Sequence, residues 1–388
     1  MAKPTLRTKL CDLLGIEYPV VLAGMSEVAG HRLAAAVSEA GGLGVIGAAI
    51  MGPDELREEI RRVRELTDKP FGVDILLPTM GSMPQASGGA SGAGEGVIPD
   101  NWRDMLPTAQ REFAASLRRK FDLPEVEPEF PTRSGGREGA IFGPGFTRSQ
   151  IDTILEEKVP VFASGLGNPA PFVEEFHAAG VKVIALVGNV KNALRVAEGG
   201  TDIVVAQGAE AGGHTGRVGT MAVVPQVVDA VAPTPVLAAG GIGDGRGLAA
   251  ALCLGAVGVW VGTAFLVSKE ANWDDVLKQR VLDASEEDTR VTRIYSGKTM
   301  RNINNPLIEA WEEAGVPTLG FPFQAAVIRD VTFAAEQAGR KELGMNPAGQ
   351  ISGMFRNQRP AGEILQQMVE QAAEIIQRLP ADTPAVTS

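Results

Sequence analysis

The sequence Thr201-Asp-Ile-Val-Val-Ala-Gln-Gly-Ala-Glu-Ala-Gly-Gly-His214 is the stretch that decides the fold. It begins with a short run of β-branched apolar residues, which is typical of a strand buried on both faces. The run ends at Gln207, and a glycine-rich loop follows that carries His214. Glycine directly after a buried strand allows a tight turn and the close approach of a ligand. The pattern therefore predicts a parallel strand whose carboxyl end belongs to a binding site.

The same arrangement recurs along the chain on both sides of this stretch. Eight short apolar runs alternate with helical patterns such as His31–Ala40, Pro53–Thr67 and Arg246–Leu254. Eight repeats of strand and helix are typical of a closed (β/α)8 barrel (a TIM barrel) or of a doubly wound sheet. The strand count and the glycine clusters after the strands favour the barrel. The predicted strands are Pro19–Ala23, Leu43–Ile46, Phe71–Leu77, Val159–Ala163, Val181–Val187, Asp202–Ala206, Thr234–Ala239 and Ala256–Val261.

Two segments of the chain are additions that a simple (β/α)8 barrel lacks. A long insertion, residues 78–147, follows the third strand and contains a Gly/Ser-rich part and a helical part, Asn101–Lys120. Long loops at this end of a barrel strand often cover the active site, so we interpret the insertion as a lid; an ornamental insertion or an oligomer contact are the alternatives. We assign residues 1–300 to the barrel, 301–380 to a helical subdomain packed on it, and 381–388 to a flexible tail. The predicted helices of the subdomain are Asn305–Ala314, Phe323–Ala338 and Pro360–Arg378.

Charge and composition exclude several functional classes. The net charge of −11 disfavours binding to nucleic acid and to anionic membranes. No apolar run reaches the roughly 20 residues that a membrane helix needs, and the N-terminus lacks the features of a secretory signal. Two cysteines in 388 residues indicate neither a disulfide framework nor a thiolate metal site. We therefore expect a cytoplasmic protein that acts on a small molecule; a homo-oligomer is compatible with the sequence, which does not specify one.

Four glycine clusters are predicted to meet on one rim of the barrel. Ala23, Gly24 and Met25 follow the first strand, where small residues let a planar ligand lie against the backbone, although a plain turn explains them equally well. After the sixth strand, the side chain of Gln207 offers both a donor and an acceptor. Gly212 and Gly213 then deliver His214 onto the rim, and we interpret His214 as functional.

The loops after the seventh and eighth strands predict a phosphate site. They contain Gly240, Gly241, Gly262 and Thr263. In barrels these two loops commonly bind phosphate through backbone N–H groups, and a threonine hydroxyl adds a donor. A phosphate held there places the rest of the ligand across the barrel mouth, a span that FMN fits. Motifs for a Rossmann dinucleotide site, a P-loop or a zinc protease are absent from the sequence.

At these residues the chain resembles the nitronate monooxygenase family, once called 2-nitropropane dioxygenases, and the related flavin-dependent enoyl-acyl-carrier-protein reductases. The most specific matches are AQGAEAGGHTGR (206–217) and LAAGGIGDGRG (237–247). AAAVSEAGGLGVIG (34–47), a G-K-x-x-R-x-x-N stretch (297–304) and a late A-G-Q (348–350) add to them. The resemblance implies FMN contacts at Met25, Gln207, Gly212, Gly240, Gly241, Gly262 and Thr263.

Two positions depart from the family pattern. Asp74 stands where the family usually has an asparagine that faces the flavin, so the resemblance places it at the cofactor. An ionised carboxylate there would disfavour an anionic reduced ring, so Asp74 is hydrogen-bonded, protonated or turned away. Trp260 stands where the family often has glutamine. Both departures bear on substrate and reaction.

The resemblance implies that the enzyme oxidises an alkyl nitronate with O2, using FMN and no nicotinamide, and yields a carbonyl compound and nitrite. His214 would hydrogen-bond the nitronate, or would take the α-proton of a neutral nitroalkane as a general base. Two alternatives share these residues: an NAD(P)H-dependent flavin reductase of an enoyl thioester or quinone, and a flavin-binding protein without catalysis. Metal dependence is not indicated.

Overall fold

The computed structural model describes residues 6–77, 106–126, 144–321 and 323–382. Within this part of the chain, one sheet holds eight parallel strands in the order β1-β9-β8-β6-β5-β4-β3-β2. Its two ends join where Val21 bridges Leu43, with the amide of Leu22 donating to the Leu43 carbonyl at 2.9 Å. The predicted barrel is confirmed. Its strands are β1 (Val20–Leu22), β2 (Gly44–Gly47), β3 (Phe71–Leu76), β4 (Val161–Leu166), β5 (Lys182–Val187), β6 (Ile203–Gln207), β8 (Val236–Ala239) and β9 (Gly258–Val261).

Apolar side chains fill the barrel interior, as its continuous apolar strands require. Val21, Ile184, Leu237 and Trp260 belong to this cluster, and the short helix α1 (Lys9–Leu14) packs against it with its buried residues. Trp260 is thus a buried core side chain, only 4% exposed. Trp260, one of the two departures from the family pattern, therefore fills the barrel interior.

Helices surround the barrel, and the last of them comes from the end of the chain. The helix α14 (Ala361–Asp382) packs against α9 and α2, so it occupies the eighth position of the ring. The Gln366 side chain donates to the Ala40 carbonyl, and the Gln371 side chain accepts from the Gly245 amide, both at 2.9 Å. The other outer helices are α2 (His31–Glu39), α3 (Pro53–Leu66), α5 (Pro144–Glu156), α6 (Val173–Ala178), α7 (Val190–Glu198), α8 (Thr220–Val231) and α9 (Gly245–Cys253).

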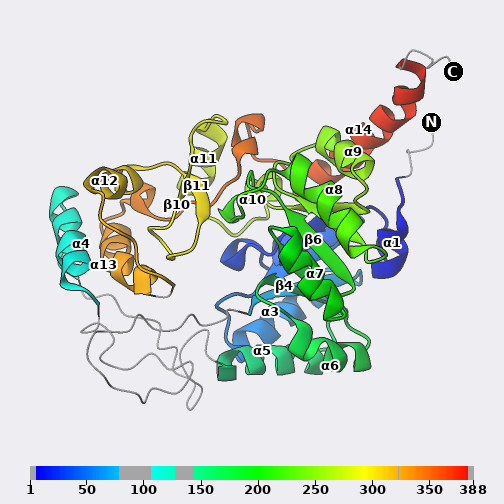
Figure 1. Ribbon diagram of the computed structural model, residues 1–388, viewed down its shortest axis with the longest axis horizontal. Coiled ribbons are helices and arrows are strands. Elements are labelled where there is room, and N and C mark those ends of the chain that lie inside the picture. Colours follow the sequence, from blue (N-terminus) through cyan, green and yellow to red (C-terminus); the bar gives the residue numbers. More distant parts are fainter. Residues whose placement is uncertain (1–5, 78–105, 127–143, 322, 383–388) are drawn as a thin grey trace.

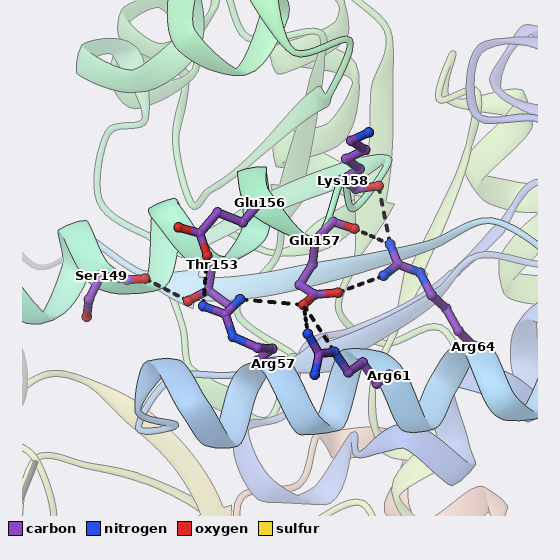
Figure 2. Close-up of polar contacts among 8 residues, drawn as sticks. All are labelled: Arg57, Arg61, Arg64, Ser149, Thr153, Glu156, Glu157 and Lys158. Carbon is purple, nitrogen blue, oxygen red and sulfur yellow. Dashed lines mark hydrogen bonds and ion pairs between the residues drawn. The ribbon is translucent and has the colours of Figure 1, made fainter.

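Ion pairs join α3 to the end of α5. Arg57, Arg61 and Arg64 are spaced at one helical face of α3, and all three contact the carboxylate of Glu157 (Figure 2). The Arg61 Nη2 and Arg64 Nη1 atoms lie 2.9 and 3.0 Å from it, and Arg57 also binds Glu156 at 2.8 Å. Three guanidinium groups on one carboxylate fix where α5 ends and where β4 begins.

A separate lobe lies beside the barrel (Figure 1), and it has its own apolar core. It combines helices of the C-terminal part with α4 from the insertion, whose Phe113 ring meets Trp311 edge-on at 5.0 Å. A three-stranded antiparallel sheet, which no sequence pattern predicted, completes the lobe. Its main elements are α4 (Thr108–Lys120), β7 (Gly213–His214), β10 (Thr289–Thr292), β11 (Met300–Ile303), α12 (Pro306–Ala314) and α13 (Phe323–Gln337).

Shorter helical elements lie in the connections of the barrel and in the C-terminal part of the chain. They are η1 (Ser26–Val28), η3 (Ala170–Phe172), α10 (Thr263–Leu266), α11 (Asp275–Asp283), η4 (Lys341–Leu343) and η5 (Gln350–Met354). The predicted helix Asn101–Lys120 is observed from Thr108 onward, after Pro107 at its N-cap. Most of the predicted lid, including its Gly/Ser-rich part, lies outside the described residues. The division of the chain at residue 300 stays a prediction.

Candidate active site

The loop after β6 carries His214 to the barrel rim and joins the two lobes. Gly213 adopts a left-handed conformation with φ of 70°, which lets the loop turn into β7. There His214 pairs with Met300 and Gly213 with Arg301 of β11. The Gln207 side chain donates to the carbonyl of His214 at 2.7 Å. The strand end thus holds the backbone of the histidine that the sequence singled out.

The His214 imidazole is partly buried and contacts Ser296. Its Nε2 lies 2.9 Å from the Ser296 Oγ, which also accepts a hydrogen bond from the amide of Lys298 at 3.2 Å. Among the described residues, Nδ1 has no hydrogen-bond partner. Burial, and then the positive charge of Lys298, lower the pKa of His214 to about 4. The ring is therefore neutral near pH 7, and one of its nitrogens remains available to a ligand.

Sequence reasoning missed Ser296, although a signal was present. Ser296 directly precedes Gly297-Lys298, the start of a stretch that resembles the family. The contact could not be predicted from the sequence because Ser296 and His214 are 82 residues apart. The other two histidines bind carboxylates elsewhere: His31 contacts Glu59 at 2.9 Å, and His177 contacts Asp202 at 2.8 Å.

Two polar anchors stiffen the loop between Gln207 and His214. The buried Arg301 guanidinium donates to the Ala209 carbonyl from Nε and Nη2, at 3.2 and 2.9 Å. The Glu210 carboxylate accepts from the amide of Thr220, at the start of α8, at 2.9 and 3.0 Å. A loop held at both flanks presents His214 in one place, as a catalytic group requires.

The predicted phosphate-site residues meet on the same rim. Gly240 and Gly241 both adopt left-handed conformations, with φ of 92° and 71°. The Thr263 hydroxyl, at the first position of α10, accepts from the amide of Gly349 at 3.0 Å and keeps its hydrogen for another acceptor. A Cβ on Gly212 would lie 2.6 Å from the carbonyl carbon of Ala348, so the late A-G-Q stretch packs directly on the His214 loop.

The residues after β1 and β3 complete the rim. A Cβ on Gly262 would lie 3.5 Å from Met25 Sδ and 3.6 Å from Ala23 Cβ, so the loops after β9 and β1 are neighbours. Asp74 is buried at the carboxyl end of β3, and its carboxylate oxygen would be 2.2 Å from a Cβ on Gly24. All the predicted site residues therefore lie at carboxyl ends of barrel strands, where barrel enzymes build their sites. Their roles in cofactor binding and catalysis stay predictions.

Comparison with known proteins identifies the family. A sequence profile of the nitronate monooxygenase family matches residues 7–371. The chain belongs to the nitronate monooxygenase family. It is 38% identical to a Mycobacterium tuberculosis protein named as a monooxygenase, over 96% of this chain and 98% of that one. It is 34% identical to a Staphylococcus aureus protein named as a nitronate monooxygenase, over 96% and 99%.

Solved structures agree with this membership. Nitroalkane oxidase from Streptomyces ansochromogenes is 28% identical, with a TM-score of 0.77 over 95% of this chain and 99% of that chain. FabK from Thermotoga maritima is 32% identical, with a TM-score of 0.73 over 98% and 100%. The protein is therefore an oxidoreductase with a TIM barrel, in a family of flavin-dependent enzymes. In the part of the chain that the structure describes, no helix is long and apolar enough to span a membrane, and no acidic, histidine or cysteine cluster could hold a metal ion.

Proposed function

We propose that the protein binds FMN and oxidises alkyl nitronates with O2, yielding a carbonyl compound and nitrite. The observation that carries the proposal is the neutral His214 on the rim, beside Ser296, with one ring nitrogen available. Membership of the nitronate monooxygenase family supports it. So does the likeness to nitroalkane oxidase.

The residues on the rim fit a flavin that carries a phosphate. Gly262 has a negative φ of −106°, and its nearest side-chain neighbours are at ordinary contact distances for a Cβ. The protein itself therefore does not require glycine there, whereas a ligand lying against the backbone does. Gly240, Gly241 and the Thr263 hydroxyl would bind the phosphate, and Ala23, Gly24 and Met25 would line the ring.

When bound, FMN supplies the redox chemistry, and the protein binds and orients the substrate. The neutral His214 would donate a hydrogen bond to a nitronate oxygen, because a neutral imidazole carries one N–H. Ser296 would fix the ring plane through Nε2, and Gln207 would fix the backbone of His214. Gly212 and Gly213 would leave room for the cofactor beside the histidine.

The electrostatics of His214 favour a nitronate over a neutral nitroalkane as substrate. A general base works best when its pKa is close to the working pH. Burial lowers the pKa of His214 to about 4, which makes the ring a weak base near pH 7. A nitronate has already lost its α-proton, so it needs a hydrogen-bond donor and no base.

One observation favours a second function, an NAD(P)H-dependent reductase. The chain is 32% identical to FabK, an enoyl-acyl-carrier-protein reductase, over nearly its whole length. Such an enzyme would share the barrel and the flavin and would act on an enoyl thioester or a quinone.

Anaerobic mixing of the purified holoenzyme separately with propionate 3-nitronate and with NADH or NADPH tests the proposal. The nitronate is expected to reduce the flavin by one electron, which changes its absorbance without full bleaching, and the nicotinamides to leave the absorbance unchanged. In air, nitrite should then form as nitronate is consumed. Bleaching by a nicotinamide alone would establish the reductase instead, and protein purified without flavin would refute the cofactor assignment.

A further inference from the structure

Asp74 lies inside the barrel mouth. Its backbone pairs with Gly47 of β2 on one side and with Ala163 of β4 on the other. Its side chain nevertheless reaches the backbone after β1, because a Cβ on Gly24 would lie 2.3 Å from the Asp74 Cβ. The strands β1 and β3 are separated by β2 in the sheet, so this contact runs through the interior. Interior side chains of such barrels form layers from alternate strands, and Asp74 belongs to the layer beneath the mouth.

Glycine residues on neighbouring elements leave space for the carboxyl group of Asp74. On β4, a Cβ at Gly165 would lie 2.9 Å from both carboxylate oxygens. Together with Gly24, this glycine leaves a space that a side chain would fill. The whole residue is only 5% exposed. A carboxyl group held this closely has a fixed position on the rim.

The carboxyl group makes a single hydrogen bond within the described residues. Oδ1 accepts from the amide of Gly165 at 2.7 Å, and Oδ2 has no partner. The facing segments are residues 23–26, 44–48 and 161–167, and none of them contains a charged or titratable side chain. Glu27 follows the first segment and is exposed. Burying an unpaired carboxylate costs several kcal/mol in a site without a cation, so a carboxyl group in such a place keeps its proton.

We propose that Asp74 is a neutral carboxylic acid that donates its O–H to an acceptor atom of the flavin ring. The proposal rests on the flavin binding proposed above. Burial raises the pKa of Asp74 well above its usual range, and the one hydrogen bond from Gly165 opposes this only in part. The acid thereby offers a donor without placing a negative charge beside the ring. It contacts the cofactor directly.

The first test uses the apoprotein and compares wild type with Asp74→Asn, a neutral variant of the same shape. If Asp74 is protonated in the fold, the unfolded chain has lost this proton above about pH 4 while the folded chain retains it. Stability then falls with rising pH in wild type relative to the variant. The variant should unfold at least about 2 °C higher at pH 8, and the gap should close towards pH 4.

The matched control is Asp229→Asn, which removes an exposed carboxylate from α8. It should show no gap that grows with pH. A carboxylic-acid C=O band in the difference infrared spectrum of wild type against Asp74→Asn at pH 7 is also expected. A constant gap at all pH values, together with a carboxylate band, would overturn the proposal.

The second test is FMN binding by the same apoproteins. The Asp74→Asn amide retains a donor, so its affinity should be close to that of wild type. Asp74→Ala removes the donor and should bind on the order of tenfold more weakly. Equal affinities of Asn and Ala would disprove the flavin contact. If wild type binds no FMN, the proposed function fails together with the contact, whereas the pH experiment still decides whether Asp74 is neutral.

Discussion

His214 illustrates how two distant segments set the chemistry of one side chain. Its backbone is fixed by Gln207 at the end of β6, and its ring by Ser296 from the turn between β10 and β11. Burial between the lobes and the nearby charge of Lys298 keep the ring neutral. The residue therefore serves better as a hydrogen-bond donor than as a base near pH 7.

This distinction predicts two different costs for His214→Asn. With a nitronate, the variant loses one hydrogen bond that asparagine replaces in part, so kcat/KM should fall by less than about tenfold. With the corresponding neutral nitroalkane, any proton transfer is lost, and kcat/KM should fall by about 10²–10⁴. Steady-state rates with both substrates, measured at equal flavin content, check the prediction.

His177→Asn is the matched control, because His177 lies on α6 and binds Asp202 away from the rim. Its rates should equal those of wild type. An equally large loss of kcat/KM with both substrates in the His214→Asn variant would contradict the prediction. It would mean that His214 transfers a proton in the nitronate reaction as well, or that it organises the whole site.

At the scale of elements, one carboxylate links three arginines of α3 to the end of α5. Glu157 has 11% of its side chain exposed and binds Arg57, Arg61 and Arg64. Partial burial by itself would raise the pKa of Glu157. The hydrogen bonds and charges of Arg61 and its neighbours outweigh this effect, and the pKa is lowered.

Glu157→Gln should lower the free energy of unfolding by about 1–3 kcal/mol, because it removes the charge that three guanidinium groups share. The pKa of Glu157 is lower in the folded than in the unfolded chain, so its contribution is complete above about pH 4.3 and disappears as the pH falls through the folded-state value. Chemical denaturation at pH 7 and at successively lower pH measures both effects.

The control for this element is Glu156→Gln. The side chain of Glu156 is 60% exposed and, among the residues that the structure describes, forms an ion pair only with Arg57. Its loss should cost less than about 1 kcal/mol, as for other exposed ion pairs. Equal costs for Glu156 and Glu157 would contradict the view that the shared carboxylate anchors α5.

At the scale of the whole molecule, the barrel and the second lobe both contribute residues to the site. The barrel supplies the glycine loops and Asp74, and the second lobe supplies Ser296 and Lys298 next to His214. The second core also depends on α4, which the chain inserts after β3. The lobe therefore assembles only when the insertion and the C-terminal part meet.

Leu117→Ala on α4 tests this dependence. Leu117 is 2% exposed within the second core, so its truncation should cost about 2–5 kcal/mol there. Hydrogen–deuterium exchange should then increase in α12 and α13, while β5 and β6 of the barrel keep their protection. Leu194→Ala, at a 39% exposed position of α7, is the control and should leave exchange unchanged. Increased exchange throughout the barrel in Leu117→Ala would show that the lobes unfold as one unit.

The sequence by itself determined the strands of the barrel and the residues on its rim. Most of the strands are recorded locally as a short apolar run followed by glycine, and the sixth run ends at Gln207. Parallel strands in a barrel all end on one rim, so the alternation of strands and helices already brought Gly240, Thr263 and His214 to the same face. These features depend on local backbone preference and on the spacing of apolar residues along the chain, both of which are set by residues close together in the sequence.

Only the tertiary structure decided which distant groups meet. It placed Ser296 on the imidazole of His214, buried Asp74 between two glycines, and brought α14 from the chain end into the ring of helices. It also joined α4 and the unpredicted sheet into the second core. Such contacts depend on how the barrel closes and how the lobes pack, and a linear pattern does not record the distance between residues far apart in the chain. The protonation of His214 and Asp74 depends on burial of this kind, so the structure alone determines it.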